Sequence, residues 1–210
     1  MAYPSNRERS LVGNTVVAML IFDERYRASG RFHDSDAYYI LVLLKKRGCL
    51  GAGRIAEELG IPKSSVHTII DLLLEDGLVG YGNRGASVTD LGRAVLRAVP
   101  IIPLELDTGL ALGECRQAVR IPDRADQITS GIPQVKLSNI MGAVGCTTWV
   151  VENGRLVMPP HKYYEYENHR ELERLVAEGN LEEGDVFLVC GADSRRAARA
   201  AALFVALDLF

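Results

Sequence analysis

Apolar side chains recur at helical spacing through the first half of the chain, and the first three helical runs each end at a glycine. The clearest case is the predicted helix over residues 63–76, which has a buried stripe at the i, i+3, i+4, i+7 and i+8 positions. A glycine-flanked turn then separates two short β patterns, which predicts a hairpin. The predicted order is a helix capped by Ser35 or Asp36 and running through Arg47, a helix over about 53–59, a helix over 63–76, a hairpin of strands 78–81 and 86–89, and a helix from a Thr89 cap through Ala98.

In the second half, short apolar runs alternate with helical segments. The clearest hairpin of the chain is centred on Asn153 and Gly154, a residue pair that favours a tight turn between two strands. The β-α-β-β-α-β-α order predicts a small α+β domain. The predicted elements are a strand over 115–121, a helix beginning near Pro133, strands over 146–151 and 155–158, a helix over 169–178, a strand over 185–190 and a helix over 194–209.

Two prolines mark the boundary between these halves. Pro100 and Pro103 fix their own φ, lack a backbone donor and push the preceding residue out of a helix. We therefore expect residues 100–103 to form a semi-rigid, extended join. The predicted divisions are an N-terminal extension over 1–34 with one helix-compatible apolar run, a domain over 35–99 and a second domain over 104–210.

Charge is distributed unevenly between the halves. The chain carries 24 basic and 27 acidic residues, a formal net charge of −3, and its pI is about 5.8. These values argue against a protein that coats nucleic acid by charge alone. Residues 1–100 hold 13 basic and 11 acidic side chains (+2), whereas residues 101–210 hold 11 and 16 (−5). Any contact with nucleic acid is therefore expected to be local and to use the first half.

The same composition bears on location, redox chemistry and metal binding. No apolar run approaches the roughly 20 residues that a membrane-spanning helix needs, so we expect a cytoplasmic protein with no membrane partner. The four cysteines lie far apart without a C-x-x-C motif, which favours buried structural thiols over a redox sensor, a zinc site or a disulfide framework. The segment 161–169 holds two histidines, but their spacing fits no common helical ligand pair, and we predict neither a metal nor a cofactor.

The outer side of the predicted helix over 63–76 carries small polar and basic side chains, which can bond phosphates and base edges in a major groove. The hairpin tip adds the amide of Asn83 and the guanidinium of Arg84, and the predicted helix over about 53–59 adds Arg54. Asp71, Glu75 and Asp76 would repel phosphate, so we expect only the first turns of the helix to contact DNA. The candidate DNA-binding residues are Arg54, Lys63, Ser64, Ser65, His67, Thr68, Asn83 and Arg84.

Four segments stand in an order typical of one domain family. They are IAEELGI at 55–61, PKSSVHTII at 62–70, LEDGLV at 74–79 and VTDLGR at 88–93. With them, residues 36–98 resemble the winged helix-turn-helix domain of prokaryotic and archaeal transcription regulators. The resemblance implies a three-helix core with a β-hairpin wing, double-stranded DNA as partner and transcription regulation as function. The second half resembles, more weakly, an uncharacterised small C-terminal domain attached to winged helices in some archaeal regulator-like proteins.

The last predicted strand leads directly into a helix that begins with two arginines. Free N–H groups, a capping side chain and guanidiniums together suit a small anionic effector. An ordinary N-cap with solvated arginines explains the same residues. The candidate anion-site residues are Asp193, Ser194, Arg195 and Arg196, with Thr147 and Thr148 approaching from the hairpin.

Alternatives to a DNA-binding regulator remain at this stage. A winged helix can serve protein contacts alone. No G-x-S-x-G, P-loop or G-x-G-x-x-G motif is present, so we expect no enzyme, although a fold can assemble a site in the second domain without a linear motif. One winged helix makes few DNA contacts, which predicts a homodimer with a second domain that senses a ligand or dimerises.

Overall fold

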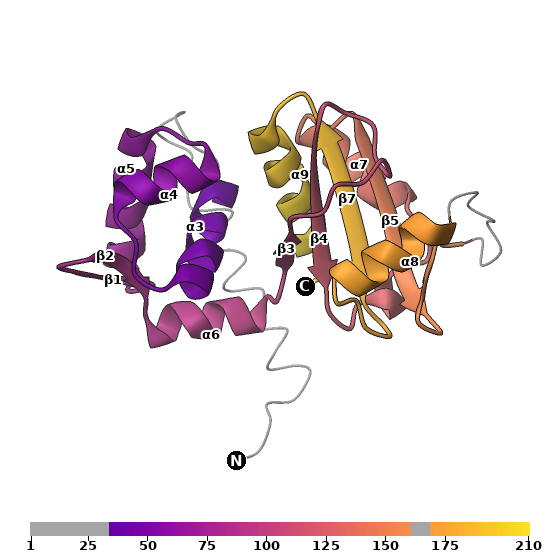
Figure 1. Ribbon diagram of the computed structural model, residues 1–210, viewed down its shortest axis with the longest axis horizontal. Helices are drawn as coiled ribbons and strands as arrows, with labels where there is room; N and C mark the ends of the chain where they lie inside the picture. Colours follow the sequence, from indigo (N-terminus) through magenta and orange to yellow (C-terminus); the bar gives the residue numbers. More distant parts are fainter. Residues whose placement is uncertain (1–33, 161–168) are drawn as a thin grey trace, which may run out of the picture. The chain divides into compact units, whose positions relative to one another are not determined.

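The computed structural model describes residues 34–160 and 169–210, which form two compact units that divide between Val99 and Pro100 (Figure 1). We refer to residues 34–99 as the N-terminal domain and to residues 100–209 as the C-terminal domain. The predicted extension over 1–34, apart from its last residue, and most of the histidine-containing segment over 161–169 lie outside the described residues.

The N-terminal domain is a three-helix core followed by a two-stranded wing and one further helix. The helices pack around side chains that are almost completely buried, among them Leu44 of the first, Ile55 of the second and Ile69 of the third. Its elements are α3 (Asp34–Arg47), α4 (Ala52–Leu59), α5 (Lys63–Glu75), β1 (Val79–Gly82), β2 (Gly85–Val88) and α6 (Asp90–Ala98). The predicted helix-helix-helix-hairpin-helix order is confirmed.

The turn between α4 and α5 follows from Gly60. This residue ends α4 in the left-handed region, with φ 65°, and the N–H of Ile61 donates to the Ala56 carbonyl at 3.2 Å. A side chain at such a position is strained, whereas glycine is not. Pro62 then precedes α5 with φ −58°, a value compatible with a helix start.

The wing is anchored to the strand-like segment before α4. The N–H groups of Leu50 and Ala86 donate to each other's carbonyls at 3.0 and 2.9 Å. Gly85 has φ 119°, and a Cβ there would lie 2.2 Å from the Leu50 carbonyl oxygen, so only glycine fits. Gly82 pairs with Gly85 as the last rung of the hairpin. The loop is therefore two residues long, shorter than the predicted four.

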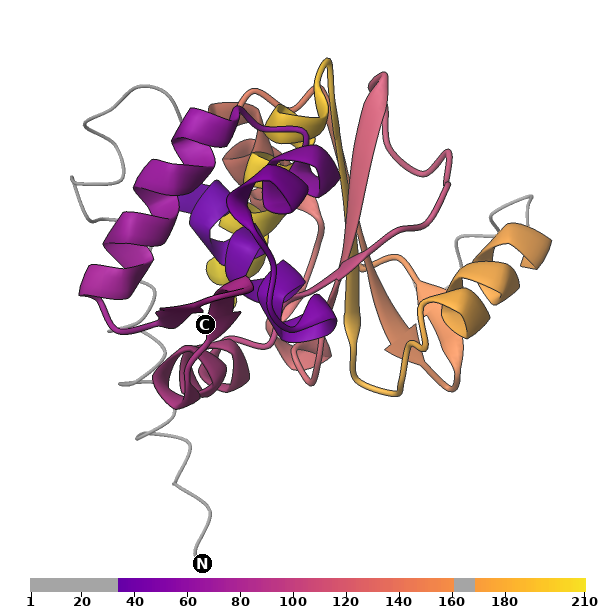
Figure 2. The ribbon, with the colours of Figure 1, turned by 60° about the vertical axis from the view of Figure 1, so that its left-hand side comes forward.

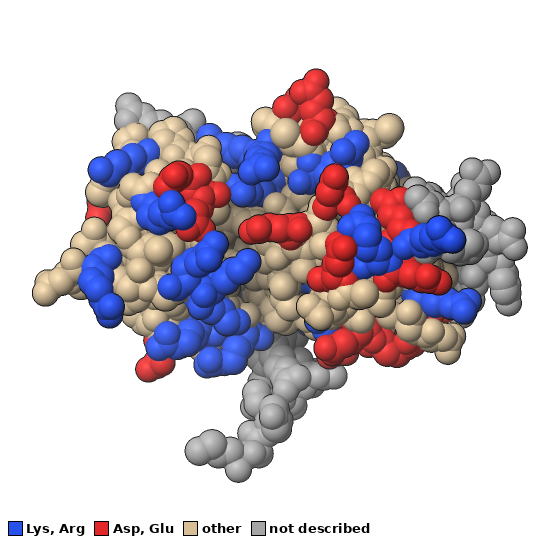
Figure 3. Space-filling view, viewed as in Figure 1, with Lys and Arg blue, Asp and Glu red and all other residues tan. Residues whose placement is uncertain are grey.

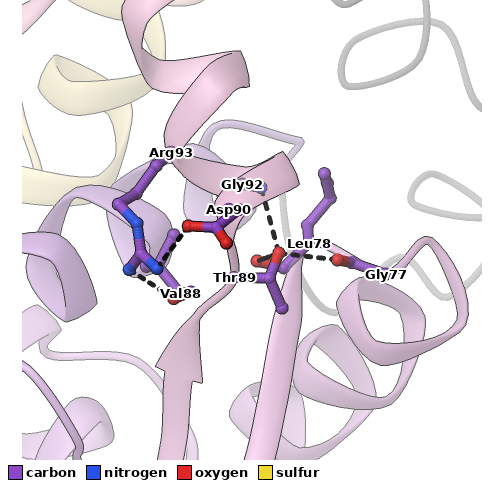
Figure 4. A network of polar contacts seen from close by, with 7 residues as sticks. All are labelled: Gly77, Leu78, Val88, Thr89, Asp90, Gly92 and Arg93. Atoms are coloured by element: carbon purple, nitrogen blue, oxygen red, sulfur yellow. Dashed lines mark hydrogen bonds and ion pairs between the residues drawn. The ribbon is translucent and has the colours of Figure 1, made fainter.

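Thr89 joins the end of α5, the wing and α6 (Figure 4). Its Oγ1 lies 2.7 Å from the Gly77 carbonyl oxygen and 3.1 Å from that of Leu78, and it accepts a hydrogen bond from the Gly92 N–H at 3.1 Å. The predicted role of Thr89 as the N-cap of α6 is confirmed. Because one side chain binds all three elements, the wing is held in a fixed place relative to α5.

The C-terminal domain is a five-stranded antiparallel sheet in the order β3-β4-β7-β5-β6. The central strand β7 is buried along its whole length, which explains its unbroken apolar sequence. The elements are β3 (Ile102–Leu104), β4 (Cys115–Ile121), η1 (Ala125–Gln127), α7 (Ile132–Ile140), β5 (Gly145–Glu152), β6 (Arg155–Val157), α8 (His169–Glu178), β7 (Val186–Ala192) and α9 (Arg195–Leu207). The predicted α+β class and element order are confirmed, with β3 and η1 added.

Helices cover both faces of this sheet (Figures 1 and 2). α8 lies on one face and α7 and α9 on the other. Trp149 and Val151 belong to the apolar core beneath α8, together with Phe187 of the central strand. Because side chains alternate along a strand, Cys146 and Thr148 face the opposite side, toward α7 and α9.

The second half of the predicted extended join is a strand of the C-terminal sheet. Pro103 pairs with Val119 in the edge strand β3, so the segment belongs to the sheet. A proline is tolerated there because an edge strand does not need every N–H for its ladder.

Candidate nucleic-acid interface

The outward side of α5 carries four of the five side chains predicted for it. Lys63, Ser64, His67 and Thr68 are exposed. Thr68 Oγ1 donates to the Ser64 carbonyl oxygen at 3.2 Å, so its hydrogen is held by its own helix while its lone pairs still face outward. These residues form a polar surface about one and a half turns long at the start of α5.

Ser65 does not belong to this surface, and the prediction that it lies on the outer side of α5 was wrong. Only 2% of Ser65 is exposed. It lies one turn before Ile69 and two turns before Leu73, both fully buried, so it continues their i, i+4, i+8 row into the core. The predicted stripe began at Val66 and included Ile69 and Leu73, but it did not extend back to Ser65.

The start of α5 has a positive electrostatic character. No side chain caps the helix at Pro62, so the first-turn N–H groups keep their partial positive charge, and Lys63 adds a full one. Asp71 and Glu75 lie exposed further along the same helix. The helix is therefore polarised, with its anion-attracting end at the turn that follows α4.

Asn83 and Arg84 form the exposed two-residue tip of the wing. Within residues 34–160 and 169–210, neither Arg84 nor Lys63 makes an ion pair. The rung formed by Gly82 and Gly85 fixes where the tip emerges. The wing thus adds a second exposed cation to the domain that contains α5.

Arg54 differs from these two cations because it is paired with acids. Its Nη1 lies 2.8 Å from Glu57 Oε2 and its Nε lies 3.1 Å from Glu58 Oε1. These carboxylates raise the pKa of Arg54, through hydrogen bonds and charge. Its predicted DNA contact would require exchange of these exposed pairs for phosphate, which is feasible because such pairs are weak.

A further group of cations lies on α3 and α6, which the sequence-based set did not include. Figure 3 shows Lys and Arg side chains gathered over the region where Figure 1 places these helices. The exposed residues that contribute are Lys45, Lys46 and Arg47 in the last turn of α3 and Arg93 and Arg97 on α6. The two groups come from segments about 50 residues apart, and the fold brings both into one domain.

The N-terminal domain itself has no net charge. Residues 34–99 contain eight Lys or Arg and eight Asp or Glu, so the +2 of the first half comes from residues 1–33. Any attraction of this domain to DNA must therefore come from the arrangement of its charges, not from their sum.

The predicted anion site in the C-terminal domain does not assemble as one site. Ser194 is the N-cap of α9, with its Oγ accepting from the Ala197 N–H at 3.2 Å, as the alternative explanation required. Thr147 Oγ1 donates to the Leu110 carbonyl, whereas Thr148 is 2% exposed and faces the other side of the sheet. The two threonines therefore cannot approach one ligand together. Asp193 and Arg195 are exposed, and Arg196 is half-buried.

Neither a metal-binding cluster nor a membrane-spanning helix is present among the described residues. No group of three or more His, Cys, Asp or Glu side chains among them is arranged to hold a metal ion. Between residues 34–160 and 169–210, no helix has the length and apolar character to cross a membrane.

The fold and its exposed helix define a winged helix-turn-helix domain followed by a small α+β domain. Comparison with known families agrees: residues 40–82 match the IclR helix-turn-helix domain, and residues 112–209 match a domain of unknown function, DUF4443. The chain thus combines a helix-turn-helix of the kind found in DNA-binding transcription regulators with an uncharacterised C-terminal domain, which confirms the resemblance.

A solved structure shares this arrangement of elements. The hypothetical protein from Pyrococcus horikoshii OT3 superposes with a TM-score of 0.63 at 19% identity, covering 83% of this chain and 91% of that one. At this identity the likeness establishes the fold alone. No curated protein matches the chain.

Proposed function

We propose that the protein is a transcription regulator that binds double-stranded DNA through the first turns of α5 and the wing. The observation that carries the proposal is the exposed polar start of α5, where Lys63 and an uncapped helix N-terminus lie beside Ser64, His67 and Thr68. In a major groove, such a helix end offers donors to phosphates and base edges at the same time. The match of residues 40–82 to a helix-turn-helix family supports the same conclusion.

The proposed docking orientation follows from the polarity of α5. The start of the helix enters the groove, while Asp71 and Glu75 stay away from the phosphates that would repel them. Arg84 at the wing tip contacts the backbone or the adjacent minor groove. With few placed cations, each domain should bind weakly and with a shallow dependence on salt.

We propose further that the protein binds DNA as a homodimer, because one winged helix makes too few contacts for tight binding. The C-terminal domain exposes a cluster of large apolar side chains on and next to α7, whose only charged residue is Lys136. Homodimer interfaces are richer in apolar surface than the rest of a protein, which makes a second copy the occupant that we propose for this surface. The exposed residues are Leu112 (75%), Ile132 (63%), Val135 (38%), Ile140 (72%) and Val144 (51%).

The dimer is tested by Ile132→Lys/Ile140→Lys, which places two charges on the exposed apolar surface without touching the core. Light scattering should show a dimer for the unmodified chain and a monomer for the double variant. DNA affinity should fall at the same time, because one half-site contact is lost. A chain that is monomeric before the change, or that stays dimeric after it, would count against this surface.

A protein-interaction module is the second candidate function. It is favoured by the zero net charge of residues 34–99 and by the acid pairing of Arg54. A winged helix that binds only protein needs neither a cationic helix start nor a cationic wing tip. The effect of Lys63 and Arg84 on DNA binding therefore separates the two candidates.

The experiment that tests the DNA-binding proposal is a set of fluorescence anisotropy titrations against genomic fragments at two salt concentrations. Lys63→Ala is expected to weaken selective binding by about 10-fold. Arg84→Ala should weaken binding to all fragments and reduce the slope of log K against log salt by about 1. Arg155→Ala is the matched control, because it removes an exposed cation from β6 in the C-terminal domain. Selective binding that survives both N-terminal changes would rule out the proposed face, and no binding to any fragment would favour the interaction module.

A further inference from the structure

Two cysteines that are 44 residues apart in sequence meet in the C-terminal sheet. Cys146 on β5 and Cys190 on β7 are directly opposite each other in the antiparallel ladder. The Cys190 thiol donates to the Cys146 sulfur, with the two sulfur atoms 3.5 Å apart. The sequence spacing gave no sign of this contact, because cross-strand neighbours leave no trace in it.

The pair has the backbone geometry that a disulfide needs. Opposite residues in an antiparallel ladder have Cα atoms about 4.5–5.5 Å apart, and disulfides form at Cα separations of about 4.4–6.8 Å. Only side-chain rotation is needed to bring the sulfur atoms from 3.5 Å to bonding distance. Gly145 and Gly191 form the next pair of the ladder, so the two cysteines lie near the start of β5 and the end of β7.

The two thiols have different environments. Cys146 is half-buried, while Cys190 is fully buried on the central strand. The hydrogen bond from Cys190, together with the hydroxyls of Ser138 on α7 and Thr148 on β5, lowers the pKa of Cys146. The same interaction and burial raise the pKa of Cys190 far above the ordinary thiol range. Cys146 is therefore the thiol that ionises first and the one that solutes can reach.

Thr148 places a buried polar group beside the Cys146 sulfur. It is 2% exposed, and among the described residues its Oγ1 has no nitrogen or oxygen partner. A buried hydroxyl without such a partner is costly, so it needs a compensating role. Its place two residues after Cys146 on the same strand puts it on the same face as the sulfur, where it stabilises a negative charge.

We propose that Cys146 and Cys190 form a redox-active dithiol that a peroxide converts into an intramolecular disulfide. The assignment rests on the C-terminal domain alone and is independent of DNA binding by the N-terminal domain. It gives a specific chemistry to a domain whose function is not known from its family.

The reaction has two balanced steps. The Cys146 thiolate attacks one oxygen of hydrogen peroxide, so that an S–O bond forms and the O–O bond breaks. Cys146 becomes a sulfenic acid, and the released hydroxide takes up the proton that Cys146 lost. The Cys190 sulfur then attacks the Cys146 sulfur, forming the S–S bond and expelling hydroxide, which combines with the Cys190 proton. Two thiols and one peroxide thus yield one disulfide and two waters.

The proposal is tested in the full chain carrying Cys49→Ser and Cys115→Ser, which leaves only the pair. Treatment with hydrogen peroxide should lower the intact mass by about 2 Da, the two thiol hydrogens. Non-reducing peptide mapping should join the peptides containing residues 146 and 190, and a thiol reductant should restore the original mass. A Cys146 oxidised to sulfinic acid beside an unmodified Cys190, a disulfide between chains, or no reaction would overturn the proposal.

Two further variants assign the roles. With Cys190→Ser added, peroxide should leave a sulfenic acid on Cys146 that dimedone traps; with Cys146→Ser instead, dimedone should label nothing. Labelling of Cys190 in the second variant would contradict the assigned order. Because either change touches the core, a measurement that needs no core mutation accompanies them. Phenylarsine oxide, which binds two neighbouring thiols, should bind the reduced pair one to one and block the disulfide, and failure to bind would argue against a reactive dithiol.

Discussion

The starts of α5 and α9 look alike in sequence and differ in structure. Each is preceded by a short turn and begins with a basic residue, and the sequence made one a candidate DNA contact and the other a candidate anion site. At α9, Ser194 accepts from the helix's own N–H at Ala197. At α5, Pro62 provides no side-chain cap, and Lys63 is exposed in the first turn. A polar residue at a helix start indicates a ligand only when the helix itself does not use it.

The largest expected effect concerns the scaffold that presents α5. A Cβ at Gly92 would lie 2.2 Å from the Leu78 carbonyl oxygen, so Gly92→Ala forces α6 away from the wing. We expect a loss of about 3 kcal/mol in the unfolding free energy of the N-terminal domain. Denaturant unfolding followed separately in the two domains measures it.

Gly53→Ala is the control for this change. It lies within α4, with no atom within 4 Å of the added Cβ and no positive φ. The domain should therefore become slightly more stable, by about 0.5–1 kcal/mol. Equal effects of the two substitutions would mean that the contacts among Leu78, Thr89 and Gly92 do not hold the wing in place.

The next effect compares the two helix starts directly. Lys63→Glu should weaken DNA binding by roughly 30- to 100-fold, because it replaces an attraction to phosphate by a repulsion. Arg195→Glu makes the same change in charge at the start of α9 and should leave DNA affinity unchanged. Anisotropy titrations at one salt concentration measure both, and a similar loss in both variants would mean that only net charge matters.

A smaller effect is expected at the cap of α9. Ser194→Ala removes the acceptor for the Ala197 N–H and should cost about 1 kcal/mol of C-terminal domain stability. Ser194→Thr keeps the accepting oxygen and should retain most of the stability of the C-terminal domain. Thermal unfolding distinguishes the three proteins, and an unchanged midpoint in the alanine variant would reopen Ser194 as a ligand-binding residue.

The smallest expected effect is the difference in DNA affinity between the alanine variants of Ser64 and Ser65. Ser64 is exposed on α5, and Ser64→Ala should weaken DNA binding a few-fold, as loss of one hydrogen bond of about 1 kcal/mol predicts. Ser65 is buried, so Ser65→Ala should change stability and leave the affinity of the folded protein unaltered. The opposite order of affinities would show that the outward side of α5 has been assigned wrongly.

The fold was largely predictable because its signals are local. The glycine after α4, the Thr89 cap and the Asn153-Gly154 turn each mark an element boundary within a few residues. The position of Pro103 in an edge strand was not predictable, because whether a strand takes a neighbour depends on the sheet.

The candidate sites were predicted less well, because they depend on which side chains the fold uses for itself. Ser65 and Ser64 are the same residue type, and only the structure shows that the buried row of Ile69 and Leu73 extends back to Ser65. The contact of Cys146 with Cys190 exists only in the register of β5 with β7. The cations of α3 and α6 belong to one surface only after the chain has folded.

The most direct test of the account is an amide chemical-shift titration of the isotope-labelled protein with a bound DNA duplex. The amides of residues 63–68 and of Asn83 and Arg84 should shift, while those of residues 194–197 should stay in place. Shifts confined to the start of α9, or none at the start of α5, would contradict the central claim that the uncapped helix start is the one that binds DNA.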